Sequence, residues 1–216
     1  MRPPMQRSRP ALASRPASSQ VIELPIPESD VALVGALQAG RAEARKALFD
    51  RYSNDVERIL YRILGPDPDT VDLLHDVFVV ALGSIGQLRD PLALPGWLRG
   101  ITVNKARKHI LRKQRWRFIQ LFAPSDMPER EAPATPLEVS AALRCTYQVL
   151  GQLPADERVA FALRFVDGME LTAVAEACSV SLATIKRRLT RAESTFKALA
   201  ADQPELAEWL AKGAER

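Results

Sequence analysis

Apolar residues recur at helical spacing, i, i+3 and i+4, through most of this 216-residue chain, and strand-type alternation is hard to find anywhere. The composition agrees, because a chain that is 47% hydrophobic but only 6% aromatic suits small helical cores built from Leu, Ala, Val and Ile. A chain of this length holds one ordinary domain or two small ones. The pattern therefore predicts an all-α protein.

Proline and glycine divide the helical pattern into two blocks. Four prolines fall within 120–136 among polar residues, which is typical of an extended, flexible linker. The first block holds four expected helices: Ser29 is the candidate N-cap of the first, Gly65 ends the second, and the last has Pro95 in its first turn and ends near Trp116. Four more are expected over about 137–153, 157–166, 171–178 and 182–199, and Gly168 ends the second of these. We thus expect two small helical domains and their flanking segments: an Arg/Pro tail 1–28, a domain 29–117, a linker 118–136, a domain 137–200 and a tail 201–216.

Basic residues gather in two places, although the formal net charge is only +4. No acidic residue occurs from Pro91 to Ser125, a stretch that carries Arg99, Lys105, Arg107, Lys108, Arg112, Lys113, Arg115 and Arg117. The second cluster consists of Lys186, Arg187, Arg188 and Arg191. Two separated basic faces suggest a polyanion bound at two places, but charge alone is equally compatible with two solvated helix faces.

Several classes of protein are disfavoured by what the chain lacks. Cys145 and Cys178 have no spacing typical of a disulfide framework or a zinc site, so we expect small buried side chains in a reducing cytoplasm. No apolar run approaches the length of a membrane span, and the Arg-containing N-terminus has no apolar signal core. Neither a phosphate-binding glycine loop nor a Ser-His-Asp arrangement is recognisable. We therefore expect a cytoplasmic protein that is not an enzyme and does not insert into membranes.

A metal site is the main chemical alternative. Asp72, His75 and Asp76 lie at i, i+3 and i+4 of one expected helix, and His with carboxylates at such spacing does occur in metal sites. The other histidine of the chain, His109, lies in the basic stretch, which repels a cation. We therefore expect no metal and no cofactor.

Residues 168–192 have the pattern of a helix-turn-helix. Leu171, Val174 and Ala175 place apolar groups on the inward face of a short helix, and Ile185 and Leu189 do so for the next one. The outward positions of the second helix are Thr184, Lys186, Arg187, Arg188 and Arg191. Such a helix can lie in the major groove of DNA with polar and cationic groups aimed at base edges and phosphates. An ordinary surface helix with basic side chains is the alternative.

Two positions of this motif depart from the most favourable residue. Ser179 stands where glycine is common, and a left-handed conformation there would cost on the order of 1 kcal/mol. Glu170 stands where Ser or Thr would be the better N-cap. Neither change is large enough to abolish the motif.

Three segments together resemble one family. Residues 72–78 (DLLHDVF) resemble the D-L-x-Q-[DE]-x-F motif of sigma region 2.2. Residues 97–111 (WLRGITVNKARKHIL) resemble the W-L-x-x-I-A-x-N-x-A-x-[DN]-x-L segment of regions 2.3 and 2.4, and the helix-turn-helix resembles region 4. In order, separation and length, the chain is similar to the extracytoplasmic-function subgroup of sigma-70-type RNA polymerase sigma factors. The resemblance covers about residues 30–200 and implies promoter-specific transcription initiation with core RNA polymerase.

The resemblance assigns the first of these segments to polymerase binding. It implies that the helix docks on the clamp helices of the beta-prime subunit, while region 4 meets the beta flap. The residues implied in core binding are Asp72, His75, Asp76 and Phe78. The acidic groups form an exposed edge beside the buried Leu74 and Phe78, and His75 replaces the usual Gln while keeping hydrogen-bonding capacity.

The second segment is assigned to the minus-ten element of the promoter. The residues implied are Trp97, Asn104, Lys105, Arg107, Lys108 and Arg112. Trp97 would anchor the helix, and Asn104 would help form a pocket for a flipped base, since its amide both donates and accepts hydrogen bonds. The cations would hold phosphates of the opened strand. Lys108 stands where Asp or Asn is common, which favours backbone attraction over base specificity.

Region 4 is assigned to the minus-thirty-five element in duplex form. Arg187 and Arg188 are candidates for base or phosphate contact, with Lys186 and Arg191 on the backbone. Factors of this kind are commonly held inactive by an anti-sigma protein, which is a further candidate partner. A helix-turn-helix regulator with an N-terminal sensing or dimerisation domain would explain 137–199 equally well. It would not explain the acid-free helix that follows Trp97 and Asn104.

Overall fold

The computed structural model describes residues 29–122, 141–203 and 206, and within these ranges the chain contains helices and turns but no strand. The all-α prediction is therefore confirmed. The elements in chain order are α1 (Asp30–Gln38), α2 (Ala42–Leu64), α3 (Thr70–Ser84), the 3₁₀ turns η1 (Ile85–Gln87) and η2 (Pro91–Ala93), α4 (Leu94–Phe122), α5 (Ala141–Leu150), α6 (Ala155–Phe161), the π-helical turn η3 (Ala162–Val166), α7 (Leu171–Ala177) and α8 (Leu182–Ala201).

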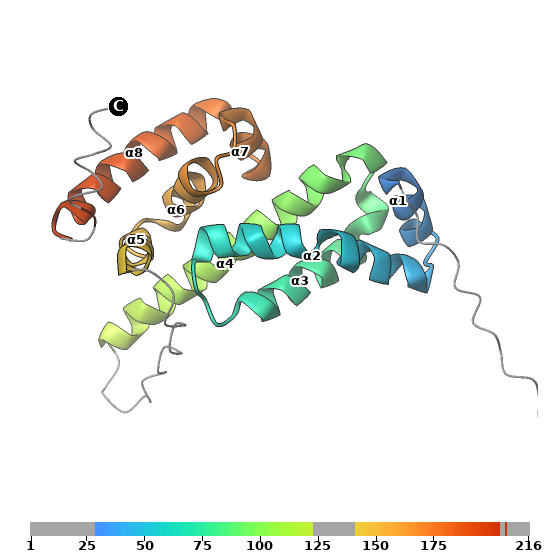
Figure 1. Ribbon diagram of the computed structural model, residues 1–216, viewed down its shortest axis with the longest axis horizontal. Helices are drawn as coiled ribbons and strands as arrows, with labels where there is room; N and C mark the ends of the chain where they lie inside the picture. Colours follow the sequence, from blue (N-terminus) through green and yellow to red (C-terminus); the bar gives the residue numbers. More distant parts are fainter. Residues whose placement is uncertain (1–28, 123–140, 204–205, 207–216) are drawn as a thin grey trace, which may run out of the picture.

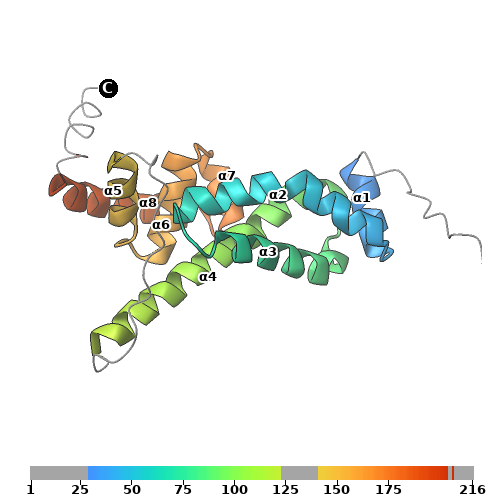
Figure 2. The ribbon, with the colours of Figure 1, turned by 60° about the horizontal axis from the view of Figure 1, so that its bottom comes forward.

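Helices α2, α3 and α4 pack against one another, and α1 lies across one end of α2 (Figures 1 and 2). Local sequence explains where these helices start and stop. The Ser29 hydroxyl accepts a hydrogen bond from the Ala32 N–H and caps α1, as the sequence predicts. Gly65 ends α2 with φ of 74°, a conformation that is strained for residues with a Cβ.

Helix α4 is longer than the sequence predicted. It continues past Trp116 to Phe122, so the first residues of the expected linker 118–136 are helical. The physical reason is the absence of a helix breaker before Pro124. Figure 2 shows this end of α4 projecting beyond the other helices, and Trp116 and Phe118 there are 49% and 64% exposed.

Helices α5 to α8 gather at the end of the bundle opposite α1 (Figures 1 and 2). Helix α6 passes into the π-helical turn η3, where the Asp167 N–H reaches back to the Ala162 carbonyl at 2.9 Å. Gly168 then leaves the helix with φ of 76°, the stop predicted for this position. The predicted helix start at 137 lies outside the described residues.

The apolar core does not stop between the two halves. One continuous cluster includes Leu98 and Ala106 of α4 together with Val159 of α6, Val174 of α7 and Ile185 of α8. A second, smaller cluster joins α5 to the end of α8 through side chains such as Leu150 and Phe196. The second half therefore packs directly on the first. Among the described helices, none combines the length and the apolar character that crossing a bilayer requires.

Candidate functional site

The helix-turn-helix is formed by α7 and α8, as the sequence predicts. Ser179 in the turn has φ of 54°, so it adopts the strained left-handed conformation expected at this glycine-type position. The Val180 N–H donates to the Ala175 carbonyl at 3.0 Å and closes the turn. Glu170 is the N-cap residue of α7, and its side chain makes no capping hydrogen bond. The side chains buried between the two helices include Val174, Ala175, Ile185 and Leu189.

The start of α8 is fixed by a residue that sequence reasoning missed. The Ser181 hydroxyl accepts from the Thr184 N–H at 3.2 Å, and the two hydroxyls lie 3.0 Å apart. A serine directly before an apolar-periodic segment was the available signal. Thr184 is therefore engaged in the cap of α8 as well as being a predicted DNA contact.

The predicted cations of α8 differ in their surroundings. Lys186, Arg187 and Arg191 are exposed. Arg188 is only 22% exposed, and its Nη2 lies 3.0 Å from Oδ2 of Asp156 at the start of α6. The exposed side chains give α8 a cationic outer face suited to phosphates and base edges. Arg188 points instead toward α6.

Helix α3 presents the predicted acidic edge. Asp72, His75 and Asp76 are exposed, whereas Phe78 is only 5% exposed and packs on Phe49 with ring centroids 4.9 Å apart. Phe78 therefore holds α3 in the bundle, and the apolar surface beside the acidic edge comes from exposed valines. These are Val71, Val79 and Val80. Leu74, expected to be buried, is half-buried.

Helix α4 carries the predicted minus-ten residues on several of its faces. Asn104 and Lys108 are exposed, and Trp97 is half-buried against the core. Lys105 Nζ lies 2.9 Å from Oδ2 of Asp76, which joins a predicted DNA contact to a predicted polymerase contact. The acidic edge of α3 and the basic face of α4 are therefore neighbours.

Comparison with known families identifies both halves. The family described as Sigma-70 region 2 matches residues 48–117, and the family described as Sigma-70, region 4 matches residues 143–195. The chain belongs to the sigma-70 family of RNA polymerase sigma factors. The resemblance inferred from the three sequence segments is thereby confirmed.

Curated relatives and solved structures agree with this assignment. The chain is 28% identical to an ECF RNA polymerase sigma-E factor of Haemophilus influenzae over 183 residues, 78% of this chain and 94% of that one. It is 27% identical to the RNA polymerase sigma-H factor of Pseudomonas aeruginosa over 196 residues, 84% and 97% of the two chains. These relatives place the sigma factor in the extracytoplasmic-function subgroup.

Two solved structures share the fold. CnrH, solved in complex with the cytosolic domain of CnrY, superposes with a TM-score of 0.55 at 23% identity, covering 81% of this chain and 98% of that one. RpoE of Bartonella quintana, solved with the anti-sigma factor NepR, gives 0.54 at 20% identity, covering 73% and 97%.

Within region 2 of this sigma factor, a buried polar cluster fixes α4 against the start of α3. His109 is buried, and its Nε2 lies 3.1 Å from Oδ2 of Asp67, while Lys113 Nζ lies 2.8 Å from the same oxygen. Because Arg112 Nη2 lies 3.1 Å from Nδ1 and a guanidinium can only donate, Nε2 carries the proton toward Asp67. Burial raises the pKa of Asp67, but the hydrogen bonds from His109, Lys113 and the Asp69 N–H together lower it below its ordinary value.

The same cluster is the place where the described residues could hold a metal ion. Ligand atoms of Asp67, Asp69 and His109 all lie within 4.8 Å of one another. Within the described ranges, Asp72, His75 and Asp76 of α3, which the sequence suggested as possible metal ligands, belong to no such group. The Lys113 ammonium already neutralises Asp67, so the cluster is a half-buried ion pair, with a carboxylate that is 9% exposed and a lysine side chain that is 43% exposed.

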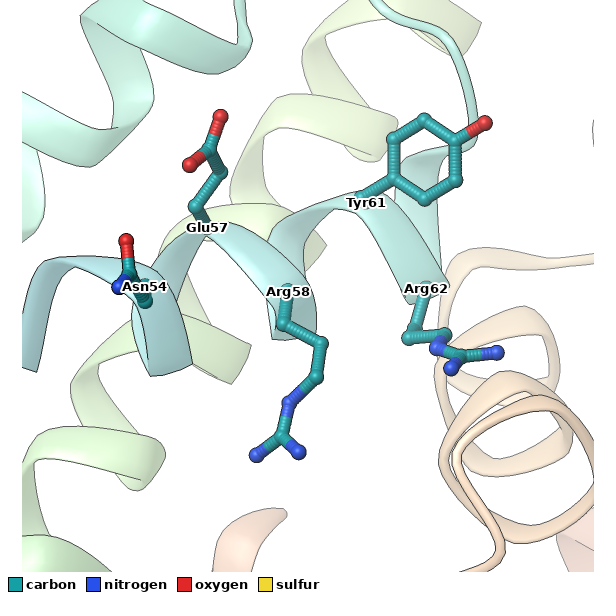
Figure 3. A pocket seen from close by; sticks show the side chains of 5 residues that line it. All are labelled: Asn54, Glu57, Arg58, Tyr61 and Arg62. Carbon is teal, nitrogen blue, oxygen red and sulfur yellow. The ribbon is translucent and has the colours of Figure 1, made fainter.

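A shallow hollow of about 450 Å³ lies along α2, and its lining is drawn in Figure 3. Its side chains are Asn54, Glu57, Arg58, Tyr61 and Arg62. Figure 3 shows Arg58 and Arg62 pointing to one side of α2, and Glu57 and Tyr61 to the other. The Arg62 Nη1 donates to the Val166 carbonyl at 3.0 Å, so the hollow borders the junction with region 4. None of the predicted site residues lines it.

Proposed function

We propose that this sigma factor binds core RNA polymerase and directs promoter-specific transcription initiation, with region 2 melting the minus-ten element and region 4 reading the minus-thirty-five element. The observation that carries the proposal is that a region 2 match and a region 4 match coincide with two helices that expose cationic side chains, α4 and α8. Melting needs no covalent catalysis, because unstacked bases held in a pocket offset the cost of opening the duplex. The protein acts as an initiation factor.

Core binding is assigned to the outer face of α3. Exposed carboxylates of Asp72 and Asp76 next to exposed valines combine charge with apolar area, which suits a partner with basic and apolar groups. His75 adds a hydrogen-bonding group between them. Phe78 supports this face from the core rather than touching the polymerase.

A charge reversal tests this docking face. Asp76→Arg should weaken core binding about tenfold, because it places a like charge against the basic partner. Asp55→Arg is a matched control, because both aspartate side chains are 59% exposed and each pairs with one neighbouring cation. Affinity capture of core polymerase on the immobilised sigma factor measures the effect. Equal retention by the Asp76 and Asp55 variants would remove the docking role.

Promoter contacts are assigned to the exposed residues of α4 and α8. Asn104 offers its amide to a flipped base, and Lys108 and Arg112 offer charge to the opened strand. On α8, Arg187 is the candidate for base-edge recognition in the major groove, with Lys186 and Arg191 on phosphates. Trp97 contributes by anchoring α4, since its ring is half-buried in the core.

In vitro transcription tests the whole proposal. Core polymerase supplied with this chain and its native genomic DNA should initiate at discrete start sites, while either protein alone should not. The chain alone should bind promoter duplex weakly. Initiation at no site, together with saturable sequence-specific binding by a free dimer, would replace the proposal by a helix-turn-helix regulator.

Two finer assignments accompany this function. We infer that the protein acts in the cytoplasm, where core polymerase meets the chromosome. We also infer that an anti-sigma factor binds this protein and keeps it inactive, because solved structures with the same fold, such as RpoE of Bartonella quintana, contain a bound anti-sigma factor. A candidate partner should abolish transcription in the same assay, and excess sigma factor should restore it. Unchanged transcription at a saturating concentration of the candidate would reject it.

A further inference from the structure

The last turns of α4 add nothing to the apolar core. Ile110 is buried, but no side chain from Leu111 to Ile119 is. Gln114 Nε2 still donates to the Leu153 carbonyl at 2.9 Å, after which the helix runs on to Phe122 and projects beyond the other helices (Figure 2). We call residues 111–119 the α4 tip. Its side chains are therefore available to a partner.

Apolar side chains gather on the α4 tip. Of the twelve large hydrophobic side chains that the described residues expose, four belong to it: Leu111, Trp116, Phe118 and Ile119. Their exposed fractions run from 38% for Leu111 to 64% for Phe118. Single exposed apolar residues are ordinary on a protein surface, whereas a gathered set marks a place of contact. The tip is thus a candidate binding surface.

The α4 tip is also cationic. Its basic residues are Arg112, Lys113, Arg115 and Arg117, and it contains no acidic residue. The Lys113 ammonium is bound to Asp67. Within the part of the chain that the structure describes, however, neither Arg115 nor Arg117 belongs to an ion pair. Charge complementarity therefore calls for an anionic partner.

These groups continue the side of α4 that carries proposed minus-ten contacts. Exposed residues at three- and four-residue spacing form one row along the helix: Asn104, Lys108, Leu111, Arg115 and Ile119. Trp116 follows Arg112 by one turn at the edge of this row. Cations and apolar groups thus alternate along one face, which begins at the residue proposed to hold a flipped base.

Unpaired DNA is the anionic partner that fits this alternation. A duplex offers its phosphates but keeps the faces of its bases stacked on one another, so an exposed indole gains little there. A single strand offers both groups, a phosphate for Arg115 and a base face for Trp116. Sequence-tolerant binding of single strands uses this combination of cationic groups and aromatic rings.

The spacing along α4 suits a continuous strand. Asn104 and Trp116 are twelve positions apart, which is about 18 Å along the helix at about 1.5 Å per residue. Roughly five stacked nucleotides cover the same length at about 3.4 Å each. A strand with one base at Asn104 therefore reaches Trp116 without leaving the helix.

We propose that the α4 tip is a binding surface for single-stranded DNA, on which Trp116 stacks on a base of the opened promoter strand and Arg115 pairs with a phosphate. This rests on the proposed role of α4 in promoter melting, and it extends the strand contact past Lys108 and Arg112. Capture of a further unpaired base adds to the free energy that keeps the minus-ten element open.

Two probes test the surface on the full chain: an oligothymidylate of about 20 nucleotides and a random-sequence duplex of about the same length. Trp116→Ala should weaken oligothymidylate binding about tenfold and duplex binding less than about twofold, since only the single strand presents base faces. Fluorescence anisotropy measures both affinities. An equal loss on the two probes, or no loss on oligothymidylate, would overturn the proposal.

Phe165→Ala is the matched control. Phe165 lies on η3 and is 50% exposed, against 49% for Trp116, so the two variants remove aromatic rings of similar exposure from different surfaces. The Phe165 variant should bind oligothymidylate within about twofold of the wild type. A loss as large as that of Trp116→Ala would mean that the α4 tip is not the surface responsible.

Conservative replacements separate stacking from simple apolar contact. Trp116→Tyr keeps a ring and should bind oligothymidylate within about threefold of the wild type, whereas Trp116→Leu keeps apolar area without a ring and should bind like Trp116→Ala. Full affinity in the leucine variant would overturn stacking. Arg115→Gln should lower the slope of log affinity against log salt by about 0.7, the share of one phosphate on a single strand.

Photo-crosslinking in the holoenzyme locates the contact. With 5-iododeoxyuridine placed singly along the opened strand of a premelted promoter, one or two adjacent positions should join to the α4 tip. Trp116→Ala should abolish that product. Absence of any product on the tip, or a loss of core-polymerase binding by Trp116→Ala, would mean that a protein covers the tip and would overturn the proposal.

The oligothymidylate measurement does not depend on transcription. If the chain initiates nowhere with core polymerase but loses single-strand affinity through Trp116→Ala, the initiation function is wrong and the DNA-binding surface stands. If initiation succeeds and Trp116→Ala changes binding to neither probe, the inference is wrong and the function stands.

Discussion

The two basic helices of this sigma factor carry similar charge but present it differently. On α4, Lys105, Arg107 and Lys113 each pair with a carboxylate outside the helix. On α8, Lys186, Arg187 and Arg191 are exposed, and Arg188 is held by Asp156. The acid-free stretch that contains α4 has more basic residues in the sequence than α8. In the structure, however, more of its cations are neutralised by carboxylates than on α8.

The difference follows from how each helix sits in the fold. Helix α4 lies between α2, α3, α6 and α7, so its cations meet Asp76 of α3, Asp156 of α6 and Asp67 in the loop before α3. Helix α8 packs one face on α5 to α7 and leaves the other to solvent. A run of basic residues in a sequence is therefore not a count of the charges available to DNA, because tertiary partners decide which of them remain available.

The largest expected effect comes from removing the acid that neutralises α4 in the core. Asp67→Ala should lower the free energy of unfolding by about 3 kcal/mol, because it leaves the buried His109 N–H and the Lys113 ammonium without their acceptor. Asp69→Ala removes a more exposed carboxylate on the edge of the same cluster. It should lower the free energy of unfolding by less than about 1 kcal/mol. Urea denaturation measures both. Equal losses would mean that the Asp67 pair does not hold α4.

The pH dependence of the same pair has a definite sign. The pKa of Asp67 is lowered in the folded protein, so its contribution to stability is present above the ordinary carboxyl pKa of about 4 and fades as pH falls below it. The stability difference between the wild type and Asp67→Asn should therefore be constant near neutrality and shrink below about pH 4. A difference that grows on acidification would contradict the assignment.

On α8, the exposed cations should matter for recognition and not for folding. Arg187→Ala should weaken holoenzyme binding to a cognate promoter by about 2 kcal/mol, roughly thirtyfold, by removing a base-edge contact. Lys197→Ala, at an exposed position further along α8, is the control. Footprinting of the minus-thirty-five element measures the loss. Identical footprints of the two variants would show that α8 is not inserted as proposed.

The turn between α7 and α8 contains backbone strain at Ser179, whose expected effect on stability is smaller. Ser179→Gly should raise the free energy of unfolding by about 1 kcal/mol, since glycine adopts the observed φ of 54° without steric cost. Ser179→Ala keeps the strain and should leave stability nearly unchanged. Thermal denaturation distinguishes the two variants. A loss of stability in the glycine variant would show that the Ser179 side chain contributes more than its backbone costs.

The smallest effect separates exposed from paired cations on α4 itself. Lys108→Ala should reduce the salt dependence of open-complex formation by about one phosphate contact, because Lys108 is exposed. Lys105→Ala should change it less, since Lys105 already pairs with Asp76. Open-complex yield measured over a range of salt concentrations reports both slopes. A larger change for Lys105 would mean that the Asp76 pair breaks on the promoter.

Sequence reasoning succeeded where the signal is local. The cap at Ser29, the stop at Gly65 and the left-handed turn at Ser179 all depend on backbone preferences of a few adjacent residues. It missed the cap at Ser181 and the extension of α4 to Phe122, although both have local signals. It predicted that Phe78 is buried, as the structure shows, but it could not tell that Leu74 is only half-buried.

The sequence alone determined the helices, their order and the family, because helical periodicity, caps and motif spacing are encoded within a few turns of chain. Only the tertiary structure decided which charges are masked, since their partners are distant in sequence: Lys105 meets Asp76 across 29 positions, Lys113 meets Asp67 across 46, and Arg107 meets Asp156 across 49. It also decided that region 4 docks on region 2. That contact depends on apolar faces which look the same in sequence whether they cover their own domain or the neighbouring one.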